Sequence, residues 1–328
     1  MTFLELFQIF ISPFKAFKKI VKEPSYIGPV LVLVLTLVAA AGVQYMTASK
    51  VNLENFALDN TLIPSARPPY NITSGFVNFT GSTKISVFTY NWTSGLDNVT
   101  IYGKNSQGED DLDVVQIIEN NTAYNTTTTF TSIIKVEFSK AGDNSTQYIA
   151  LGTNQYEGVL DKGLFGGLVA SSLIGRAFGF LINWVLYALL LYVFIKVFRE
   201  EVESLGSLFM IVGYVFVVTL IYPIVSILLI PLLPPVMMPL QTWNLPLGAT
   251  EAAKTAANNL VNQIYQQAWY STLTYQALLG LLYVIDVWIV ALFVVAIHFY
   301  SDVSWKKSVG ISVIAYLVRF ALSVFVGI

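Results

Sequence analysis

The sequence predicts a membrane protein in which a bundle of five transmembrane α-helices carries an extracellular all-β, sandwich-like domain between its first two helices. Of 328 residues, 55% are hydrophobic and only 12% are charged, outside the range of ordinary soluble proteins. Five apolar runs are each long enough, as helices, to cross a hydrocarbon layer of about 30 Å. Between the first two runs, residues 50–162 change abruptly to a composition rich in Asn, Thr, Ser and Gly.

The N-terminal segment, residues 1–26, is predicted to be a cytoplasmic amphipathic basic helix. Its apolar row recurs at alternating steps of three and four, and lysines occupy other positions. The apolar row is Phe3, Phe7, Phe10, Phe14, Phe17 and Val21, and the basic residues are Lys15, Lys18, Lys19 and Lys22. Ser12 and Pro13 predict a helix restart, with Ser12 as the cap and Pro13 in the first turn. We expect the segment to lie in the lipid headgroup layer, and packing beneath the bundle is a compatible alternative.

Five segments are predicted to span the bilayer: residues 27–48, 165–198, 205–233, 272–300 and 308–328. The second of them includes an extension on the outer side. The turn at residues 196–203 holds two cations and three anions, so it must lie in water. Residues 234–271 are predicted to form an extracellular loop and a helix, which Thr250 caps.

The start of the second span carries small or polar residues at every fourth position. These residues are Gly167, Ser171, Gly175, Gly179 and Asn183. A helix places them along one line, where small side chains let a neighbouring backbone approach closely. Packing inside the bundle is the simpler interpretation, and a dimer face is the alternative. Asn183 is placed to hydrogen-bond a neighbouring helix instead of lipid.

Residues 50–162 are predicted to form a β-domain of the sandwich type. Alternating polar and apolar stretches occur between Gly, Asn and Asp turn signals, at residues 84–90, 99–102, 114–118 and 132–138. The domain holds 7 Lys and Arg against 12 Asp and Glu. It is therefore expected to be an acidic, solvated domain.

The same domain holds all the Asn-x-Ser/Thr sequons of the chain. They lie at Asn71, Asn78, Asn91, Asn98, Asn120, Asn125 and Asn144. One sequon is weak evidence, because the pattern is common by chance. A cluster confined to one segment between membrane spans indicates N-linked glycans. The alternative is that a Thr- and Asn-rich strand composition produces sequons incidentally.

The distribution of cations predicts the orientation. Five spans place the termini on opposite sides, and the positive-inside rule chooses between the two arrangements. With the N-terminus inside, the inner segments hold Lys15, Lys18, Lys19, Lys22, Lys196, Arg199, Lys306 and Lys307, whereas the outer loop holds only Lys254. We therefore expect a plasma-membrane protein with a cytoplasmic N-terminus. Its C-terminus and residues 50–162 would be extracellular.

The residue types exclude several classes of chemistry. The chain has no cysteine, and His298 is its only histidine, so disulfides, thiolate sites and histidine-rich metal centres are excluded. It has no Gly-x-Ser-x-Gly, no His-Glu-x-x-His, and no phosphate-loop or dinucleotide-binding pattern. We therefore expect no enzymatic activity, no cofactor and no nucleic-acid partner.

Three stretches resemble the Ypt-interacting protein (YIP) domain family: residues 12–29 before the first span, 203–214 entering the third, and 303–309 between the last two. The resemblance covers the membrane part, somewhat over half of the chain. It implies five spans with the N-terminus in the cytoplasm. Eukaryotic members of the family bind Rab-type GTPases, but the inserted domain and the short N-terminal arm depart from the family pattern. Together with the sequons and the absence of cysteine, the resemblance implies an archaeal plasma membrane.

Two functions remain open. The first is a non-enzymatic scaffold, assembly or trafficking-type protein that displays the glycosylated domain and binds membrane or cell-surface proteins. The second is a small-solute or ion permease component that uses the intramembrane residues Asp286 and Arg319. Counted from the turn between the last two spans, these residues lie at depths of roughly 21 Å and 17 Å. Because they are nearly level, we expect them to form an ion pair.

The sequon cluster makes the first testable prediction. Mass spectrometry of the native protein should find sugar-modified peptides that contain Asn71, Asn91 or Asn125. Unmodified peptides throughout, from a host that glycosylates its surface proteins, would contradict it.

Overall fold

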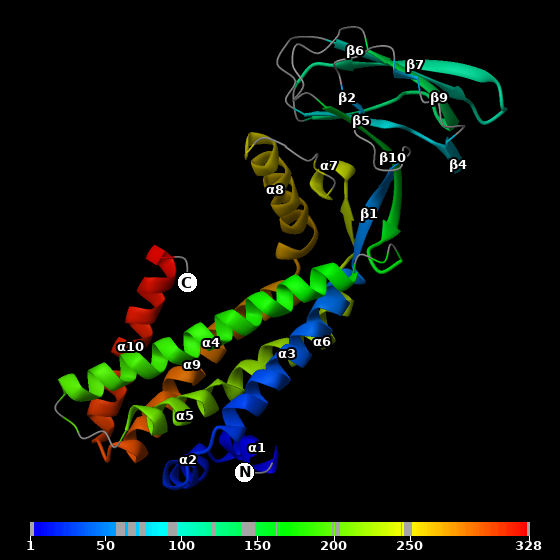
Figure 1. Ribbon diagram of the computed structural model, residues 1–328. Coiled ribbons are helices and arrows are strands. Elements are labelled where there is room, and N and C mark those ends of the chain that lie inside the picture. Colours follow the sequence, from blue (N-terminus) through cyan, green and yellow to red (C-terminus); the bar gives the residue numbers. More distant parts are fainter. Residues whose placement is uncertain are drawn as a thin grey trace. The chain divides into compact units, whose positions relative to one another are not determined.

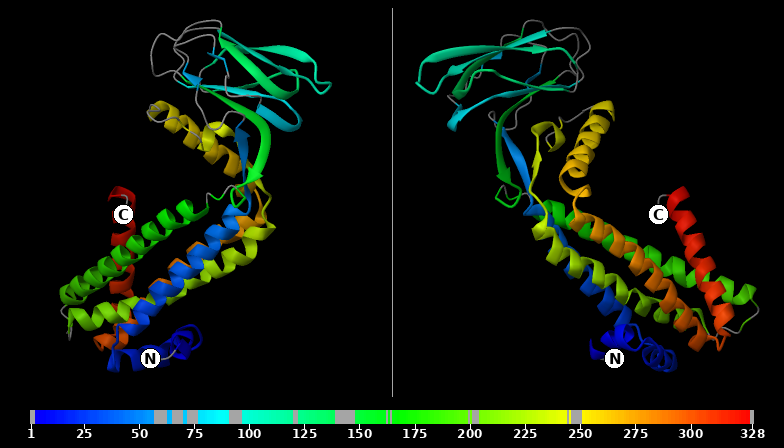
Figure 2. Two further views of the ribbon diagram at one scale, coloured as in Figure 1. Left: turned by 45° about the vertical axis from the view of Figure 1, so that its right-hand side comes forward. Right: turned by 180° about the vertical axis from the view of Figure 1, so that it is seen from behind.

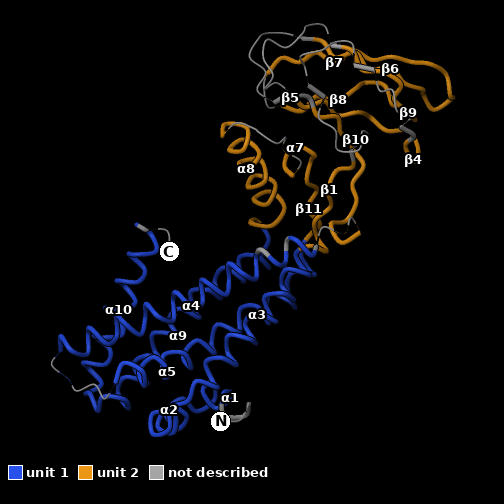
Figure 3. The backbone as a smooth tube through the Cα atoms, viewed as in Figure 1, with its two compact units in different colours: residues 1–47, 164–233, 272–328 blue, residues 48–163, 234–271 orange. Residues whose placement is uncertain are grey.

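The structure is a computed structural model, and it describes residues 3–56, 63–64, 70–71, 77–90, 97–119, 122–138, 148–161, 163, 165–198, 200, 204–243, 245 and 251–326. The chain divides into two compact units (Figure 3). The helical unit comprises Met1–Thr47, Leu164–Leu233 and Thr272–Ile328, and the β unit comprises Ala48–Gly163 and Pro234–Ser271. A separate β-sheet domain inserted after the first long helix is therefore confirmed.

Within the described residues, five helical segments are long and apolar enough to cross a membrane, as the sequence predicts. They are α3 (Ile27–Ala48), α4 (Phe165–Val197), the composite third segment, α9 (Leu273–Tyr300) and α10 (Trp305–Val326) (Figure 1). Large apolar side chains point outward from these segments, among them Leu228 at 68% exposure and Val287 at 71%. A surface of this kind suits hydrocarbon. Figure 2 shows that α10 crosses α4 at a steep angle instead of running alongside it.

The third segment is not a continuous α-helix. It consists of α5 (Leu205–Val215), the 3₁₀-helix η1 (Phe216–Leu220), α6 (Ile221–Leu229) and the 3₁₀-helix η2 (Ile230–Leu232). Pro223 has no N–H to donate to the carbonyl of Thr219, four residues earlier, which weakens the α-helical pattern at this point. The Thr219 hydroxyl instead donates to the Phe216 carbonyl at 2.7 Å. The segment therefore tightens locally near its middle.

The N-terminal segment forms two short helices, α1 (Phe3–Ile11) and α2 (Pro13–Lys22). Ser12 takes the cap position and Pro13 lies in the first turn, as expected, but the Ser12 side chain makes no capping hydrogen bond. The apolar row is split between two environments. Phe17 is fully buried against the bundle, whereas Phe7 and Phe14 are about half exposed, at 50% and 52%. Packing beneath the bundle therefore accounts for one part of the row, and Phe7 and Phe14 remain half exposed.

Close approaches at glycine hold α3, α4 and α5 together. A side chain at Gly28 would overlap the ring of Tyr214, and one at Gly213 would meet Pro29 and Trp184. The Tyr214 hydroxyl donates to the Ser25 carbonyl at 3.0 Å. The Trp184 indole donates to the Phe209 carbonyl at 2.6 Å and stacks on the Phe209 ring.

Two sheets make up the β unit. The first has the order β11-β1-β10-β5-β8 with β2 paired to β10, and the second has the order β3-β9-β6-β7 with β4 paired to β9. Their bounds are β1 Val51–Phe56, β2 Ile63–Pro64, β3 Tyr70–Asn71, β4 Val77–Thr83, β5 Ser86–Tyr90, β6 Asp97–Lys104, β7 Asp110–Ile117, β8 Ala123–Asn125, β9 Phe130–Phe138, β10 Tyr148–Gly158 and β11 Val236–Met238. Buried residues from both sheets, such as Val87 and Leu151 from the first and Ile101 and Ile133 from the second, share one core. The packing is that of a sandwich.

The segment after the third span belongs to the β unit, not to a separate loop. Its strand β11 pairs in parallel with β1, with Val51 opposite Val236 and Leu53 opposite Met238. Two helices follow, α7 (Leu240–Trp243) and α8 (Glu251–Tyr265), and the latter continues as a π-helical turn, Gln266–Tyr270. The Trp269 indole donates to the Pro234 carbonyl at 2.9 Å, which closes the segment on itself.

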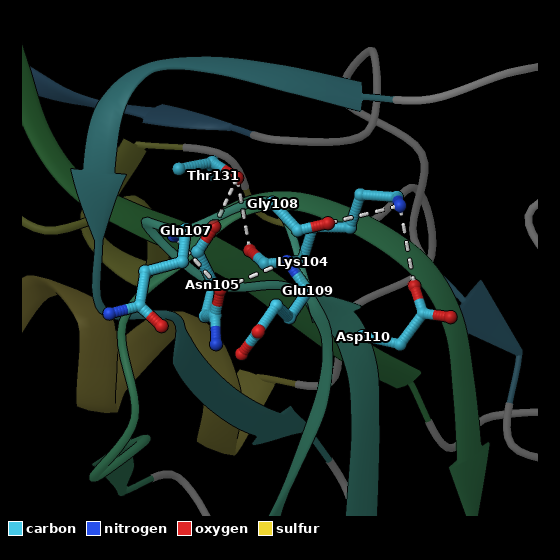
Figure 4. Close-up of polar contacts among 7 residues, drawn as sticks. All are labelled: Lys104, Asn105, Gln107, Gly108, Glu109, Asp110 and Thr131. Atoms are coloured by element: carbon cyan, nitrogen blue, oxygen red, sulfur yellow. Dashed lines mark hydrogen bonds and ion pairs between the residues drawn. The ribbon is translucent and has the colours of Figure 1, made fainter.

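The turn between β6 and β7 is held by local polar contacts (Figure 4). The Asn105 side-chain oxygen accepts from the backbone N–H groups of Gln107, at 2.9 Å, and Glu109, at 3.1 Å. Gly108 adopts a φ of +79°, which a residue with a Cβ rarely reaches. The Thr131 hydroxyl, from β9, lies 3.0 Å from the carbonyls of Lys104 and Asn105. These bonds fix the register of the longest hairpin in the second sheet.

Glu54 ties the first sheet to α7. Its side chain is only 1% exposed, and its carboxylate accepts three hydrogen bonds. The donors are the Ser86 hydroxyl at 2.8 Å, the Asn154 N–H at 2.7 Å and the Leu240 N–H at 2.9 Å. A Cβ on residue 152 would collide with this carboxylate, which accounts for Gly152 on the neighbouring strand. One carboxylate thus joins β1, β5, β10 and α7.

We predict that Glu54→Gln destabilises the β unit by roughly 2–3 kcal/mol, because an amide nitrogen would face one of the three buried donors. Hydrogen exchange of peptides from β1 and β5, measured by mass spectrometry in the full chain, should accelerate tenfold or more. The control is Glu109→Gln, whose side chain is exposed at the β6–β7 turn. Equal exchange in both variants would show that the Glu54 cluster adds little stability.

Candidate polar cavity in the helical unit

A cavity of about 310 Å³ lies among α3, α4, η1, α6, α9 and α10 of the helical unit. Its polar lining consists of Thr36, Arg176, Asn183, Tyr187, Thr219, Tyr222, Asp286 and Arg319. Since a water molecule occupies about 30 Å³ in the liquid, the space holds roughly ten waters or one small solute. Apolar helices of membrane-spanning length surround it. Polar and charged groups are therefore concentrated where the sequence is otherwise hydrophobic.

Arg319 is held by an uncharged partner. Its Nε donates to the Asn183 side-chain oxygen at 2.9 Å, and the Asn183 amide donates in turn to the Gly179 carbonyl at 2.8 Å. This chain of bonds joins α10 to α4. Asn183 thus contacts a neighbouring helix, as the sequence suggests, and it fixes the position of a cation.

Asp286 is also held by an uncharged partner. The Tyr316 hydroxyl, one helix away on α10, donates to its carboxylate at 3.1 Å. Among the residues that the structure describes, no ion pair joins Asp286 to Arg319. The two charges expected to pair line the same cavity, but each is oriented by a different neutral group. The fold brings the two residues to one site without a direct salt bridge.

Arg176 is a third charged residue of the cavity, and the sequence reasoning did not single it out. It follows Gly175 on α4, near the start of the apolar part of that helix, Ser172–Val197. The sequence could have indicated it, because Arg176 is the only charged residue in α4 before Lys196. The cavity wall therefore carries two guanidinium groups and one carboxylate.

The small-residue line on α4 faces open space at three of its positions, Gly167, Gly175 and Gly179. A Cβ added to any of these three glycines would meet no atom of the described residues within 4 Å. The role of this line in helix packing therefore stays a prediction. The side chain of Ser171 lies outside the described residues. On another side of the helix, the Gln44 amide of α3 donates to the Ser172 hydroxyl at 2.8 Å.

The structure places four of the seven sequon asparagines. Asn98 on β6 and Asn125 on β8 are exposed, while only the backbone is described for Asn71 and Asn78. Asn91, Asn120 and Asn144 lie outside the described residues. Exposure of Asn98 and Asn125 is the condition that glycosylation requires, and the modification itself stays a prediction.

The hydroxyl residue of the Asn125 sequon, Thr127, belongs to a small polar cluster. Its hydroxyl donates to the Asp113 carboxylate at 2.8 Å, and the N–H of Thr128 donates to the same oxygen at 2.8 Å. Partial burial alone would raise the pKa of Asp113, but the hydrogen bonds from Thr128, Thr127 and Val114 outweigh it and lower the pKa. The carboxylate therefore stays charged and holds the turn before β9.

The part of the chain that the structure describes holds no candidate metal site. Across the described ranges, no group of three His, Cys, Asp or Glu side chains could hold a metal ion. His298 stacks on Trp305, with ring centroids 3.9 Å apart, and its Nδ1 lies 2.6 Å from the Val303 carbonyl. Both contacts pack the turn between α9 and α10.

Comparison of the chain with protein-family models, curated proteins and solved structures gave no match. The resemblance to the YIP domain family therefore stays a prediction. Conclusions about function rest on the cavity and on the separate β unit.

The separate partners of Asp286 and Arg319 lead to a prediction for double-mutant cycles. Because Asn183 holds Arg319 directly, Asn183→Leu and Arg319→Leu should show a coupling free energy of roughly 1–3 kcal/mol in thermal unfolding of the detergent-purified protein. The cycle of Asp286→Asn with Arg319→Leu should give a smaller value. A larger value in the second cycle would show that the two charges form the direct clasp expected from sequence.

Proposed function

We propose that the chain is a non-enzymatic, multi-pass plasma-membrane protein whose helical unit binds a small charged solute in the polar cavity. It would act as a solute-binding or permease component. The observation that carries the proposal is the arrangement of Asp286 and Arg319, which line one cavity without pairing with each other.

The energetic argument starts from the cost of charge in an apolar setting. An ionised side chain among membrane-spanning helices is costly unless it meets another charge, hydrogen-bond partners or water. A protein that needed only stability could cancel these two charges by direct contact. Here Asn183 and Tyr316 hold the charged groups in place while leaving part of each of them to the cavity. This arrangement favours a polar occupant over a structural clasp.

The irregular third segment supports the same proposal. Phe216 and Thr219 of η1, together with Tyr222 and Pro223 of α6, form one wall of the cavity. Breaks in membrane helices are tolerated where the backbone lines a cavity, and in transporters they commonly lie at the binding site. A 3₁₀ stretch beside a proline also offers a place where the wall can move.

A second candidate function is a YIP-like scaffold that binds membrane or cell-surface proteins through its glycosylated β unit. One observation favours it. The edge strand β7 exposes Leu112 at 52% and Val114 at 49% on the outer face of the second sheet. An apolar pair on an edge strand is a usual place for contact with another chain. Solute binding in the helical unit and partner binding by the β unit are compatible.

Thermal unfolding tests the solute-binding proposal. The full chain, purified in mild detergent, is heated with a panel of small organic anions, organic cations and amino acids. At least one class should stabilise the wild type by about 2–3 kcal/mol when present at roughly 100 times its Kd.

The variant with Asp286→Asn and Arg319→Gln should lose this response. Lys306→Gln is the matched control, because Lys306 is exposed at the start of α10 and lies outside the cavity. No response from the wild type, or an equal response from the double variant, would contradict the proposal. Purification of the wild type in a stable complex with a partner protein would favour the scaffold.

A further inference from the structure

We propose that the cavity selects aromatic monocarboxylates. This inference rests on the proposed function and names the class of solute. It follows from the charge of the lining, from the way one guanidinium is held, and from the aromatic corner beside it.

Charge is the first argument. Arg176 and Arg319 contribute two permanent cations, and Asp286 contributes one carboxylate, so the lining carries a formal charge of +1. Guanidinium groups only donate hydrogen bonds. One of the Asp286 oxygens already accepts from Tyr316. Donors therefore exceed acceptors around the cavity, and a singly charged anion would bring its charge close to neutral.

The orientation of Arg319 is the second argument. Its Nε is occupied by Asn183, whose own amide is fixed to the backbone of α4 at Gly179. The bond at Nε therefore fixes the orientation of the guanidinium plane. The two terminal nitrogens can then donate to a ligand. A carboxylate matches two parallel N–H groups of a guanidinium better than a spherical anion does. Fixing the group in advance reduces the entropy lost on binding.

The aromatic lining is the third argument. Phe180, Tyr187 and Phe216 meet at one part of the cavity wall: the Phe180 and Phe216 rings lie 5.4 Å apart, and the Tyr187 and Phe216 rings 5.8 Å apart. The ring planes are tilted by 57° and 59°. Tyr187 and Phe216 are buried, at 4% and 5% exposure, so with the partly exposed Phe180 they form an apolar end of the cavity that suits a ring better than a hydrated group. Leu282 and Ile285 of α9 add apolar surface to the lining. The ligand therefore has a compact ring as well as a carboxylate.

Size agrees with this class. A space for roughly ten waters accommodates a molecule of about ten non-hydrogen atoms. Benzoate has this size and is the probe for the experiment. Benzamide has the same shape without charge, and benzylammonium has a similar ring with the opposite charge.

Isothermal titration of the detergent-purified full chain with these three probes tests the inference. Benzoate should bind at least tenfold more tightly than benzamide, and benzylammonium should show no binding. Arg319→Gln should weaken benzoate binding by tenfold or more. Asp286→Asn should strengthen it, because the variant removes a like charge from the cavity while an amide can still accept from Tyr316.

Two further variants keep the test decisive. If Arg319→Gln fails to fold, Arg176→Gln serves in its place, because Arg176 is an exposed part of the lining. Lys306→Gln should bind benzoate as the wild type does. Binding of benzylammonium that is lost in Asp286→Asn would overturn the carboxylate class and leave the solute-binding proposal intact. Absence of binding by all three probes would overturn the aromatic carboxylate class, and absence of any response to the wider panel of anions, cations and amino acids would overturn both proposals.

Discussion

Burying a polar group among apolar helices is costly unless the group is hydrogen-bonded, and this constraint shapes the helical unit. The Trp184 indole reaches the Phe209 carbonyl, the Tyr214 hydroxyl reaches the Ser25 carbonyl, and the Tyr300 hydroxyl bonds the backbone of Ser204. Each bond joins parts of the chain that are at least 25 residues apart. The same constraint applies more strongly to charges, and the partners of Arg319 and Asp286 are therefore the most informative contacts in the unit. Both partners are neutral, which separates this arrangement from that of a simple structural ion pair.

Much of the helical unit could be predicted because length and hydropathy depend on few residues at a time. The five segments, the break at Ser12–Pro13 and the presence of Asp286 and Arg319 at one site follow from counting along the chain. The partners of those charges could not be predicted, since they depend on how α10 crosses α4 and on side-chain rotamers. Arg176 was missed for a related reason: near the end of a span, an arginine is normally assigned to the headgroup layer.

The sequence predicted that the β unit consists of β-strands, but it did not predict that residues 236–238 belong to it. Alternation over residues 84–90 and 132–138 indicated strands, and β5 and β9 occupy nearly these ranges. The three-residue strand β11 is too short to show a period of two, and it lies beyond two long helices, so nothing local assigned it to this unit. Glu54 gave no signal either, because a glutamate in an alternating stretch normally faces water. Its burial depends on Leu240, which lies 186 residues away.

The parallel pairing of β1 with β11 also determines when this unit can be completed during synthesis. Strand β1 precedes α4, whereas β11 follows η2, so the edge of β1 that β11 covers stays open until residues 165–233 have been translated. An open strand edge is prone to pairing with other chains. The third Glu54 donor, the Leu240 N–H, also arrives only then. Residues 165–233 must therefore be synthesised before the first sheet can close, and any delay in that interval prolongs the exposure of an aggregation-prone edge.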